Sequence, residues 1–327
     1  MSSEPVRGDP IVRELVRHAL ESVVDEMALT VVRTAFSPTL RDVMDFSTAF
    51  CNPRGEMVAQ GLTLPLHLGA FPDALRSVLD KYGDELGPGD VFILNDPYAG
   101  GMHLPDVFLI KPVFVDGELI GFPATVGHQA DVGGRVPGGN ACDSTEIFQE
   151  GLRIGPLRLY ERGQENETLV DLIRRNVRVP DNVLGDLGAQ LSALHVGEQG
   201  LVRLARRYGP SGLLAYGDEL IAQSEQMARQ EIGSWPDGIY RFTDYLDDDG
   251  IRLGEPVRIC VTVTIQGSEI TVDFAGTAPQ VASAINSSIS SSKSAVWLTL
   301  RSLMDPGIPN TAGCSGRSGW SRRKERS

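Results

Sequence analysis

The sequence predicts an α+β protein in which β-hairpins and helices occupy different parts of the chain. Apolar runs joined by turn residues, which are typical of β-hairpins, occur within residues 46–60 and 91–126. Residues 169–232 repeat apolar side chains at helical spacing, and residues 259–274 return to the alternation of a strand pair. We therefore predict a mixed β-hairpin and sheet region at the N-terminal end, a helical middle and a further β-hairpin region.

The length of 327 residues is enough for about two domains with a sizeable core. We divide the chain into an N-terminal α/β region (1–160), a helical region (161–235), a β-hairpin region with one helix (236–310) and a tail (311–327). The tail is basic, although the chain as a whole is acidic, and no hydrophobic pattern continues into it. This indicates an aberrant or truncated C-terminus, with a basic nucleic-acid-binding tail as the alternative.

The N-terminal elements are predicted from caps and turns. Asp9-Pro10 starts a helix that runs to about Thr34, because aspartate caps a helix and proline suits its first position. Asn52-Pro53-Arg54-Gly55 has the sequence of a type I turn and joins the two strands of the first hairpin. A short helix over residues 73–82 and a buried strand at Val91–Leu94 follow.

The strongest hairpin signal is Asp116-Gly117, which separates the apolar runs Val107–Val115 and Glu118–Val126. Pro112 and Pro123 each remove a ladder hydrogen-bond donor, which fits an edge strand or a bulge. A slip of one residue would turn side chains to the other face, so the ladder predicts proximity better than orientation. Without a slip, the pairs at the open end are Asp106 with Gly127 and Pro105 with His128.

This hairpin brings His103, Asp106 and His128 to one place, although His128 is distant from the other two in the sequence. Two imidazoles and one carboxylate are the nitrogen and oxygen ligands that a catalytic divalent metal takes, with positions left for water or substrate. We predict a metal site with these three ligands. The alternative is that both histidines are ordinary hydrogen-bonded loop residues.

The segment Asp131–Gly151 is rich in glycine and has no regular pattern. Long irregular segments are usually functional or disordered, and this one lacks the composition of disorder, so we predict an ordered active-site loop. Asp131 and Glu146 are its candidates for a further ligand or a general base, with solvated carboxylates as the alternative.

The other histidines are predicted to be structural. His67 lies in an apolar run and is expected to be buried, with a supporting role at the metal or substrate as the alternative. His18 and His195 lie in predicted helices and are expected to be surface or packing residues.

The second half of the chain is predicted from punctuation and alternation. Pro180 and Pro210 divide three helices, and Gly267-Ser268 joins two strands in a half-buried hairpin. The predicted spans are Leu169–Val177, Asp181–Tyr208 and Leu213–Ile232 for the helices, Ile259–Ile265 and Glu269–Phe274 for the hairpin, and Ser294–Met304 for a last helix.

Composition limits the classes of partner. A net charge of −13 makes nucleic acid or an anionic membrane surface an unfavourable partner, and no apolar run approaches the roughly 18 residues of a membrane span. The N-terminus has no signal-peptide core, and the four scattered cysteines indicate reduced thiols, so a cytoplasmic protein is expected. The sequence contains no P-loop or dinucleotide fingerprint, so ATP binding by this chain is not expected.

The motifs NDPYAGGMHLPD (95–106), HQADVGG (128–134) and DSTEIFQEGLRI (143–154) resemble the hydantoinase B/oxoprolinase family, and the likeness extends to about Asn310. That family includes B-type subunits of ATP-dependent hydantoinases, the C-terminal half of 5-oxoprolinase and a subunit of acetone and acetophenone carboxylases. The resemblance implies that His103, Asp106 and His128 bind a divalent metal, with manganese favoured over zinc or iron.

The resemblance further implies a hetero-oligomer that opens a cyclic amide. An A-type partner subunit would bind ATP and phosphorylate the substrate, and the present chain would complete metal-assisted ring opening, with Asp131, Glu146 or Asp96 as base or orienting group. Two alternatives remain: the metal-binding subunit of an ATP-dependent ketone carboxylase, and a truncated assembly subunit without activity.

The chain departs from the family pattern at three places. Met102 replaces a common threonine, and Gln129 replaces a second histidine found in some members. After Asn310 the sequence becomes TAGCSGRSGWSRRKERS, where the family continues with a long further region, and this supports the truncated alternative.

Overall fold

The structure, a computed structural model, describes residues 9–67 and 69–314. Its centre is an eight-stranded sheet in the order β2-β1-β6-β4-β3-β7-β8, with β5 paired to β6, and every pairing is antiparallel. The strands are β1 (Phe46–Cys51), β2 (Met57–Gln60), β3 (Val91–Leu94), β4 (Asp106–Ile110), β5 (Val113–Val115), β6 (Glu118–His128), β7 (Leu157–Glu161) and β8 (Gln164–Glu165).

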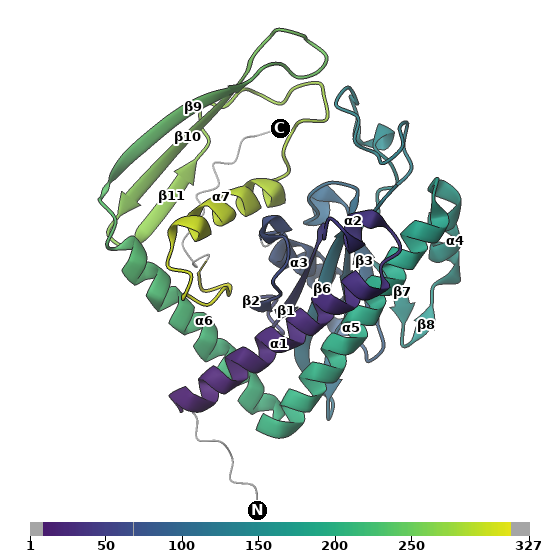
Figure 1. Ribbon diagram of the computed structural model, residues 1–327, viewed down its shortest axis with the longest axis vertical. Coiled ribbons are helices and arrows are strands. Elements are labelled where there is room, and N and C mark those ends of the chain that lie inside the picture. The colour runs from purple at the N-terminus through teal and green to yellow at the C-terminus, as the bar shows by residue number, and fades with distance from the viewer. Residues whose placement is uncertain (1–8, 68, 315–327) are drawn as a thin grey trace, which may run out of the picture.

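Helices cover both faces of this sheet. On one face α1 (Pro10–Thr34) and α5 (Pro180–Tyr208) lie side by side, as Figure 1 shows, and belong to the core that contains Val107 and Leu109 of β4. On the other face α3 (Phe71–Tyr82) and α7 (Ile289–Leu303) belong to the core that contains Phe108 and Ile110. Burial on both faces explains why these strands are continuous apolar runs in the sequence.

The predicted helices are confirmed, with shifts of up to three residues at most ends. The exception is α7, which begins at Ile289 rather than at Ser294, because Ser288 and not the end of the serine-rich segment caps it. Asp9 caps α1 by accepting hydrogen bonds from the backbone of Ile11 and Val12. The remaining helices are α2 (Pro38–Arg41), α4 (Glu167–Asn176) and α6 (Pro210–Ile232). Residues of α5 and α6 share one hydrophobic core with the sheet and α1.

The central hairpin contains a bulge that the ladder extrapolation missed. Val115 pairs with Glu118 as predicted, but the register shifts between Phe114 and Val113, where β6 carries one extra residue. Asp106 therefore pairs with His128 rather than with Gly127, so the predicted end pairs were wrong by one residue.

The two prolines both lie on the open-end side of this irregularity. Pro112 lies between β4 and β5, outside both strands. Pro123 lies in β6, an internal strand between β1 and β4, so the edge-strand alternative was wrong for this residue.

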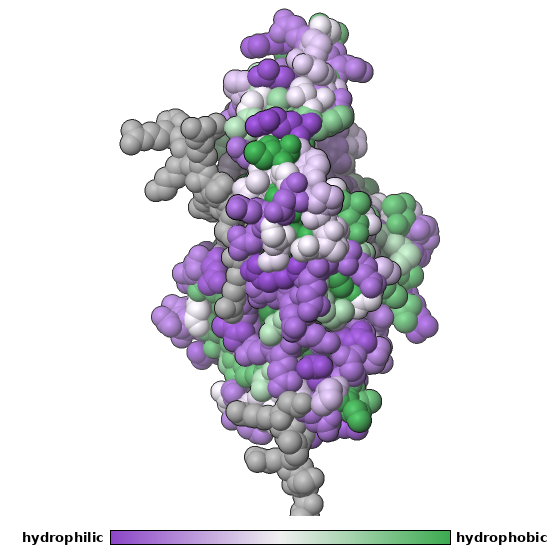
Figure 2. All heavy atoms as spheres, turned by 90° about the vertical axis from the view of Figure 1, so that its left-hand side faces the viewer, coloured by the Kyte–Doolittle hydropathy of each residue, from purple (hydrophilic) through white to green (hydrophobic). Residues whose placement is uncertain are grey.

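A second, three-stranded sheet follows α6 in the order β11-β10-β9. Its strands are β9 (Gly238–Leu246), β10 (Val257–Gln266) and β11 (Glu269–Asp273), so the predicted hairpin is present and β9 joins it as a third strand. Phe242 and Tyr245 of β9 are largely exposed. Figure 2, which views the molecule from this side, shows hydrophobic residues in small groups among hydrophilic ones.

The last described residues are packed into the body of the protein. The backbone amide of Ala312 donates to the carbonyl of Met57 at 2.7 Å, and Thr311 and Cys314 are buried. The first four residues of the predicted tail, 311–314, thus pack against the body of the protein. Its basic part, residues 317–327, lies outside the described residues. Within the described part of the chain, no helix has the length and apolarity to cross a membrane.

Candidate metal centre

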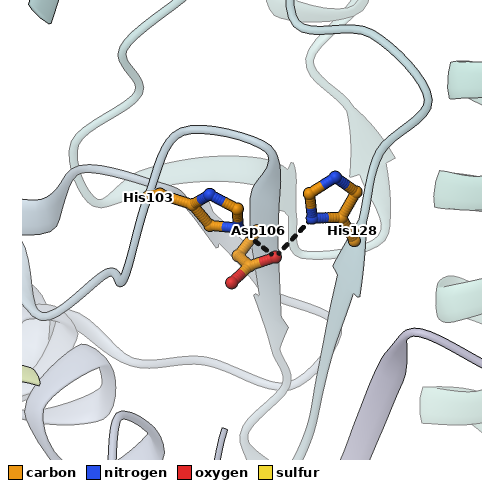
Figure 3. Close-up of side chains that lie close together, drawn as sticks. All are labelled: His103, Asp106 and His128. Atoms are coloured by element: carbon orange, nitrogen blue, oxygen red, sulfur yellow. Dashed lines mark hydrogen bonds and ion pairs between the residues drawn. The ribbon is translucent and has the colours of Figure 1, made fainter. Parts of the chain in front are cut away.

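The structure brings His103, Asp106 and His128 together at the open end of the β4–β6 pair. Asp106 is the first residue of β4, His128 is the last residue of β6, and His103 lies in the turn before β4. Figure 3 shows the two imidazoles on either side of the Asp106 carboxylate. His103 Nε2 lies 2.9 Å and His128 Nδ1 3.1 Å from the same oxygen, Asp106 Oδ1. One ligand atom from each residue lies within 4.8 Å of the other two.

The turn that carries His103 is held by the buried side chain of Asn95. Its amide nitrogen donates to the carbonyl of Leu104 at 2.6 Å, and its oxygen accepts from the backbone of Ile154 at 2.6 Å. Gly100 has a φ of +94°, and a Cβ there would lie 2.4 Å from the backbone of Ala74. Glycine is thus needed where this loop passes the start of α3.

The contacts within the cluster shift the pKa values of Asp106 and His103 in opposite directions. Burial would raise the pKa of Asp106, but the hydrogen bonds from His103 and His128 outweigh burial and hold that pKa well below its usual range. Burial would lower the pKa of His103, but the contact with Asp106 outweighs it and raises that pKa. The cluster therefore holds an ionised carboxylate that attracts positive charge, either protons on the imidazoles or a metal ion.

Two further side chains border the cluster. Asp45, which precedes β1, lies 3.9 Å from His128 through its Oδ2 and 3.9 Å from His67 through its Oδ1. His67 is buried as predicted, its Nε2 is 3.6 Å from Asp106 Oδ2, and burial lowers its pKa. Asp45 was not predicted from the sequence, because its position depends on the pairing of β1 with β6, which are far apart in the chain.

The residue before Asp45, Met44, has a strained backbone conformation. Met44 adopts a φ of +60°, which residues other than glycine seldom do, and such strain is concentrated at functional sites. The backbone amide of His128 also donates to the carbonyl of Asp45 at 3.0 Å, so the two residues are fixed relative to each other.

The predicted loop Asp131–Gly151 is irregular, with one short turn of 3₁₀ helix at Ile147–Gln149. Asp131 organises it: its carboxylate accepts from the backbone of Gly133 (3.0 Å), Gly138 (2.9 Å) and Arg178 (2.8 Å), and from the Arg178 guanidinium (2.9 Å). Burial would raise the pKa of Asp131, but these donors lower it. Both of its oxygens are therefore engaged by donors from the loop and from Arg178.

The other two predicted carboxylates also lie apart from the metal cluster. Asp96 accepts from the backbone of Tyr98 at 2.9 Å and pairs with Arg153 at 2.9 Å, while Glu146 is exposed. Within residues 9–67 and 69–314, no hydrogen bond or ion pair joins Asp96, Asp131 or Glu146 to the three predicted ligands. Glu150 interacts electrostatically with His103, and burial raises its pKa, which the sequence did not indicate.

Replacement of Asp131 by asparagine is expected to lower the free energy of unfolding by about 2–4 kcal/mol at pH 7. The amide replaces one acceptor oxygen by an NH2 group, which would face the N–H donors that now contact the carboxylate. The folded pKa of Asp131 is lowered, so its stabilisation is present above the unfolded pKa of about 4 and is lost as the pH falls through the folded value. Urea unfolding at pH 7 and below pH 4 measures both effects. The exposed Glu146→Gln is the matched control, and equal stability of the two variants would contradict this role for Asp131.

The remaining histidines are confirmed as helix-surface residues. His18 is exposed and lies 3.2 Å from Glu21 on α1, and His195 is exposed and hydrogen-bonded to Gln199 on α5. They provide control positions for substitutions at the cluster.

The fold and the site define an α+β protein with a candidate His–Asp–His metal centre at the end of a central antiparallel sheet. The family model for hydantoinase B/oxoprolinase matches residues 9–317, so the chain belongs to that family. This membership confirms the resemblance seen in the loop motifs.

Several relatives support the same assignment. The chain is 40% identical to the beta subunit of the caprolactamase of Pseudomonas jessenii, over 89% of this chain and 50% of that protein. It is 35% identical to a putative D-/L-hydantoinase B subunit of a Pseudomonas strain, over 90% and 52% of the respective chains. It is also 31% identical to 5-oxoprolinase 1 of Arabidopsis thaliana, over 94% and 26%. The chain thus spans about half the length of the bacterial relatives.

Two solved structures share the fold. The crystal structure of the ATP-dependent caprolactamase of Pseudomonas jessenii matches with a TM-score of 0.90 and 38% identity, over 96% of this chain and 54% of that one. A nucleotide-free acetone carboxylase matches with a TM-score of 0.89 over 96% and 43%, and at 19% identity this likeness concerns the fold alone.

Proposed function

We propose that this chain is the metal-binding B-type subunit of an ATP-dependent cyclic-amide hydrolase. The main support is the convergence of His103, Asp106 and His128, whose ligand atoms lie within 4.8 Å of one another. Further support comes from two relatives that match about nine tenths of this chain, a caprolactamase beta subunit and a putative D-/L-hydantoinase B subunit.

The donor atoms suit a divalent cation. Two ligands at right angles on an ion with bonds of about 2.1 Å stand about 3.0 Å apart. The distances from Asp106 Oδ1 to the two histidine nitrogens, 2.9 and 3.1 Å, agree with that spacing. The side chain of His103 is 41% exposed, which leaves room for substrate beside it. Manganese is favoured by the family resemblance, with zinc or iron as alternatives.

A bound divalent ion would lower the pKa of the attacking water and stabilise negative charge that develops on the activated substrate. The residues of this chain would supply orientation and proton transfer. Asp131 and Asp96 have partners that fix the loops, so we assign them orienting roles. Glu146, exposed on the same loop, and Glu150, which interacts with His103, are the two candidates for the general base.

An unactivated cyclic amide is a poor electrophile, so activation by ATP is expected before ring opening. We assign ATP binding and phosphorylation of the substrate to an A-type partner subunit, since this sequence has no recognisable nucleotide-binding motif. The active form would accordingly be a hetero-oligomer.

The test is substrate-dependent ATP hydrolysis by this chain together with an A-type subunit, with cyclic amides as substrates. Wild type, His128→Ala and the surface control His195→Ala are compared. We expect ring opening by wild type and the control, and a loss of at least about 100-fold in the His128 variant. Turnover that requires bicarbonate and a ketone would instead indicate a carboxylase. Tight assembly without any turnover would indicate an assembly subunit.

A further inference from the structure

His67 is a buried imidazole directly behind the candidate metal centre. It ends the short 3₁₀ helix Pro65–His67 and is only 2% exposed. Its Nε2 lies 3.6 Å from Asp106 Oδ2, whereas His103 and His128 both contact Oδ1. The Asp106 carboxylate thus has one oxygen toward the two histidines and the other toward His67.

The hydrogen bonds of Ser47 fix the tautomer of His67. The Ser47 hydroxyl donates its single hydrogen to the carbonyl of Leu64 at 2.6 Å, because a carbonyl can only accept. Ser47 Oγ must therefore accept from His67 Nδ1, which lies 2.9 Å away. The proton of the neutral ring therefore sits on Nδ1. Nε2 carries no proton, so its 3.6 Å approach to Asp106 Oδ2 is a packing contact and not a hydrogen bond.

Ser47 and Leu64, the two residues that hold His67, are themselves fixed to β1. Ser47 is fully buried in β1 and pairs with Val126 of β6, the strand that ends at His128. The backbone amide of Leu64 donates to the carbonyl of Phe46, also in β1. The ring of His67 is consequently fixed to the same strand pair that places His128.

We propose that His67 is a positioning residue: its buried ring packs against Oδ2 of Asp106 and blocks rotation of the carboxylate, so that Oδ1 stays turned toward His103 and His128. The inference rests on the proposed metal centre and adds a residue that supports it. A carboxylate free to rotate must lose that freedom when it binds a metal, and a neighbour that fixes it beforehand raises the affinity. Partners of metal ligands typically contribute 10–100-fold to metal affinity.

Two substitutions of His67 distinguish the role of the Nε2 side of the ring from that of the Nδ1 side. Glutamine carries its amide out to the position of Nε2, whereas asparagine reaches only the position of Nδ1. The dissociation constant for Mn²⁺ is measured by titration of the metal-free full chain. His67→Asn is expected to weaken binding by about 10–100-fold, and His67→Gln to bind more tightly than His67→Asn. The exposed His195→Gln is the control and should bind like wild type.

Three readouts test the role of His67. Mn²⁺ affinity of His67→Asn within twofold of wild type would overturn it, and so would an equal loss in the Asn and Gln variants. If His67→Asn does not fold, Ser47→Ala removes the acceptor for Nδ1 and is expected to weaken Mn²⁺ binding; unchanged affinity would overturn the proposal. Nitrogen-15 NMR of the histidines should show the His67 proton on Nδ1, and a proton on Nε2 alone would contradict it.

Different results would reject the proposed metal centre and the proposed role of His67. Wild-type protein that binds no Mn²⁺ would reject the metal centre, and the role of His67 with it. Wild-type protein that binds one Mn²⁺ while the His67 and Ser47 variants bind equally well would reject the role of His67 alone.

Discussion

Replacing Asp106 with asparagine is expected to abolish stoichiometric metal binding, with a loss of affinity well above about 100-fold. Asp106 is the only one of the three predicted ligands that carries a negative charge, and both histidines contact its Oδ1. It is also 2% exposed, so it meets a cation in surroundings that water screens poorly. The metal content of purified protein and titration with Mn²⁺ measure the loss.

The matched control for this substitution is Asp143→Asn. Asp143 is an exposed aspartate on the glycine-rich loop and pairs with Arg135 rather than with the cluster. It should bind metal like wild type. Full metal content in the Asp106 variant, with the fold intact by circular dichroism, would contradict its assignment as a ligand.

Replacing Gly121 with alanine is expected to destabilise the protein by about 3 kcal/mol or more. Gly121 follows the bulge in β6 with a φ of +143°, and a Cβ there would lie 2.3 Å from the carbonyl oxygen of Cys51. The bulge determines that Asp106 pairs with His128. Relief of the clash by movement of β6 would therefore also weaken metal binding.

Gly117→Ala provides the comparison for this effect. Gly117 lies in the turn of the same hairpin with a φ of +84°, but no atom lies within 4 Å of a Cβ placed on it. It should cost about 1 kcal/mol, from backbone strain alone. Urea unfolding of the two variants separates steric conflict from strain, and equal costs would show that the close approach to Cys51 is unimportant.

Local signals in the sequence were sufficient for most elements. The helix from Pro10 to Thr34 was predicted to the residue, because its ends depend on the adjacent Asp9 cap and the Ser37-Pro38 stop. The turn at Asp116-Gly117 was also correct, since both residues adopt the positive φ that such a turn requires. These features depend on a few neighbouring residues and can be read without the fold.

Features that depend on contacts between distant parts of the chain could not be predicted from the sequence. The bulge in β6 arises where the strand passes Phe50 and Cys51 of β1, and no local signal distinguishes it from a regular ladder. The places of Asp45 and His67 beside the cluster likewise follow from the pairing of β1 with β6. For Asp131 the residue type suited either catalysis or loop structure, and the four donors that contact its carboxylate could not be identified from the sequence.

The most direct test of the metal centre is anomalous X-ray diffraction from crystals of the full chain grown with Mn²⁺. We expect one strong anomalous peak about 2.0–2.3 Å from a nitrogen of His103, a nitrogen of His128 and an oxygen of Asp106. A fully occupied peak elsewhere, or none at this position with all three side chains ordered, would contradict the proposed metal centre.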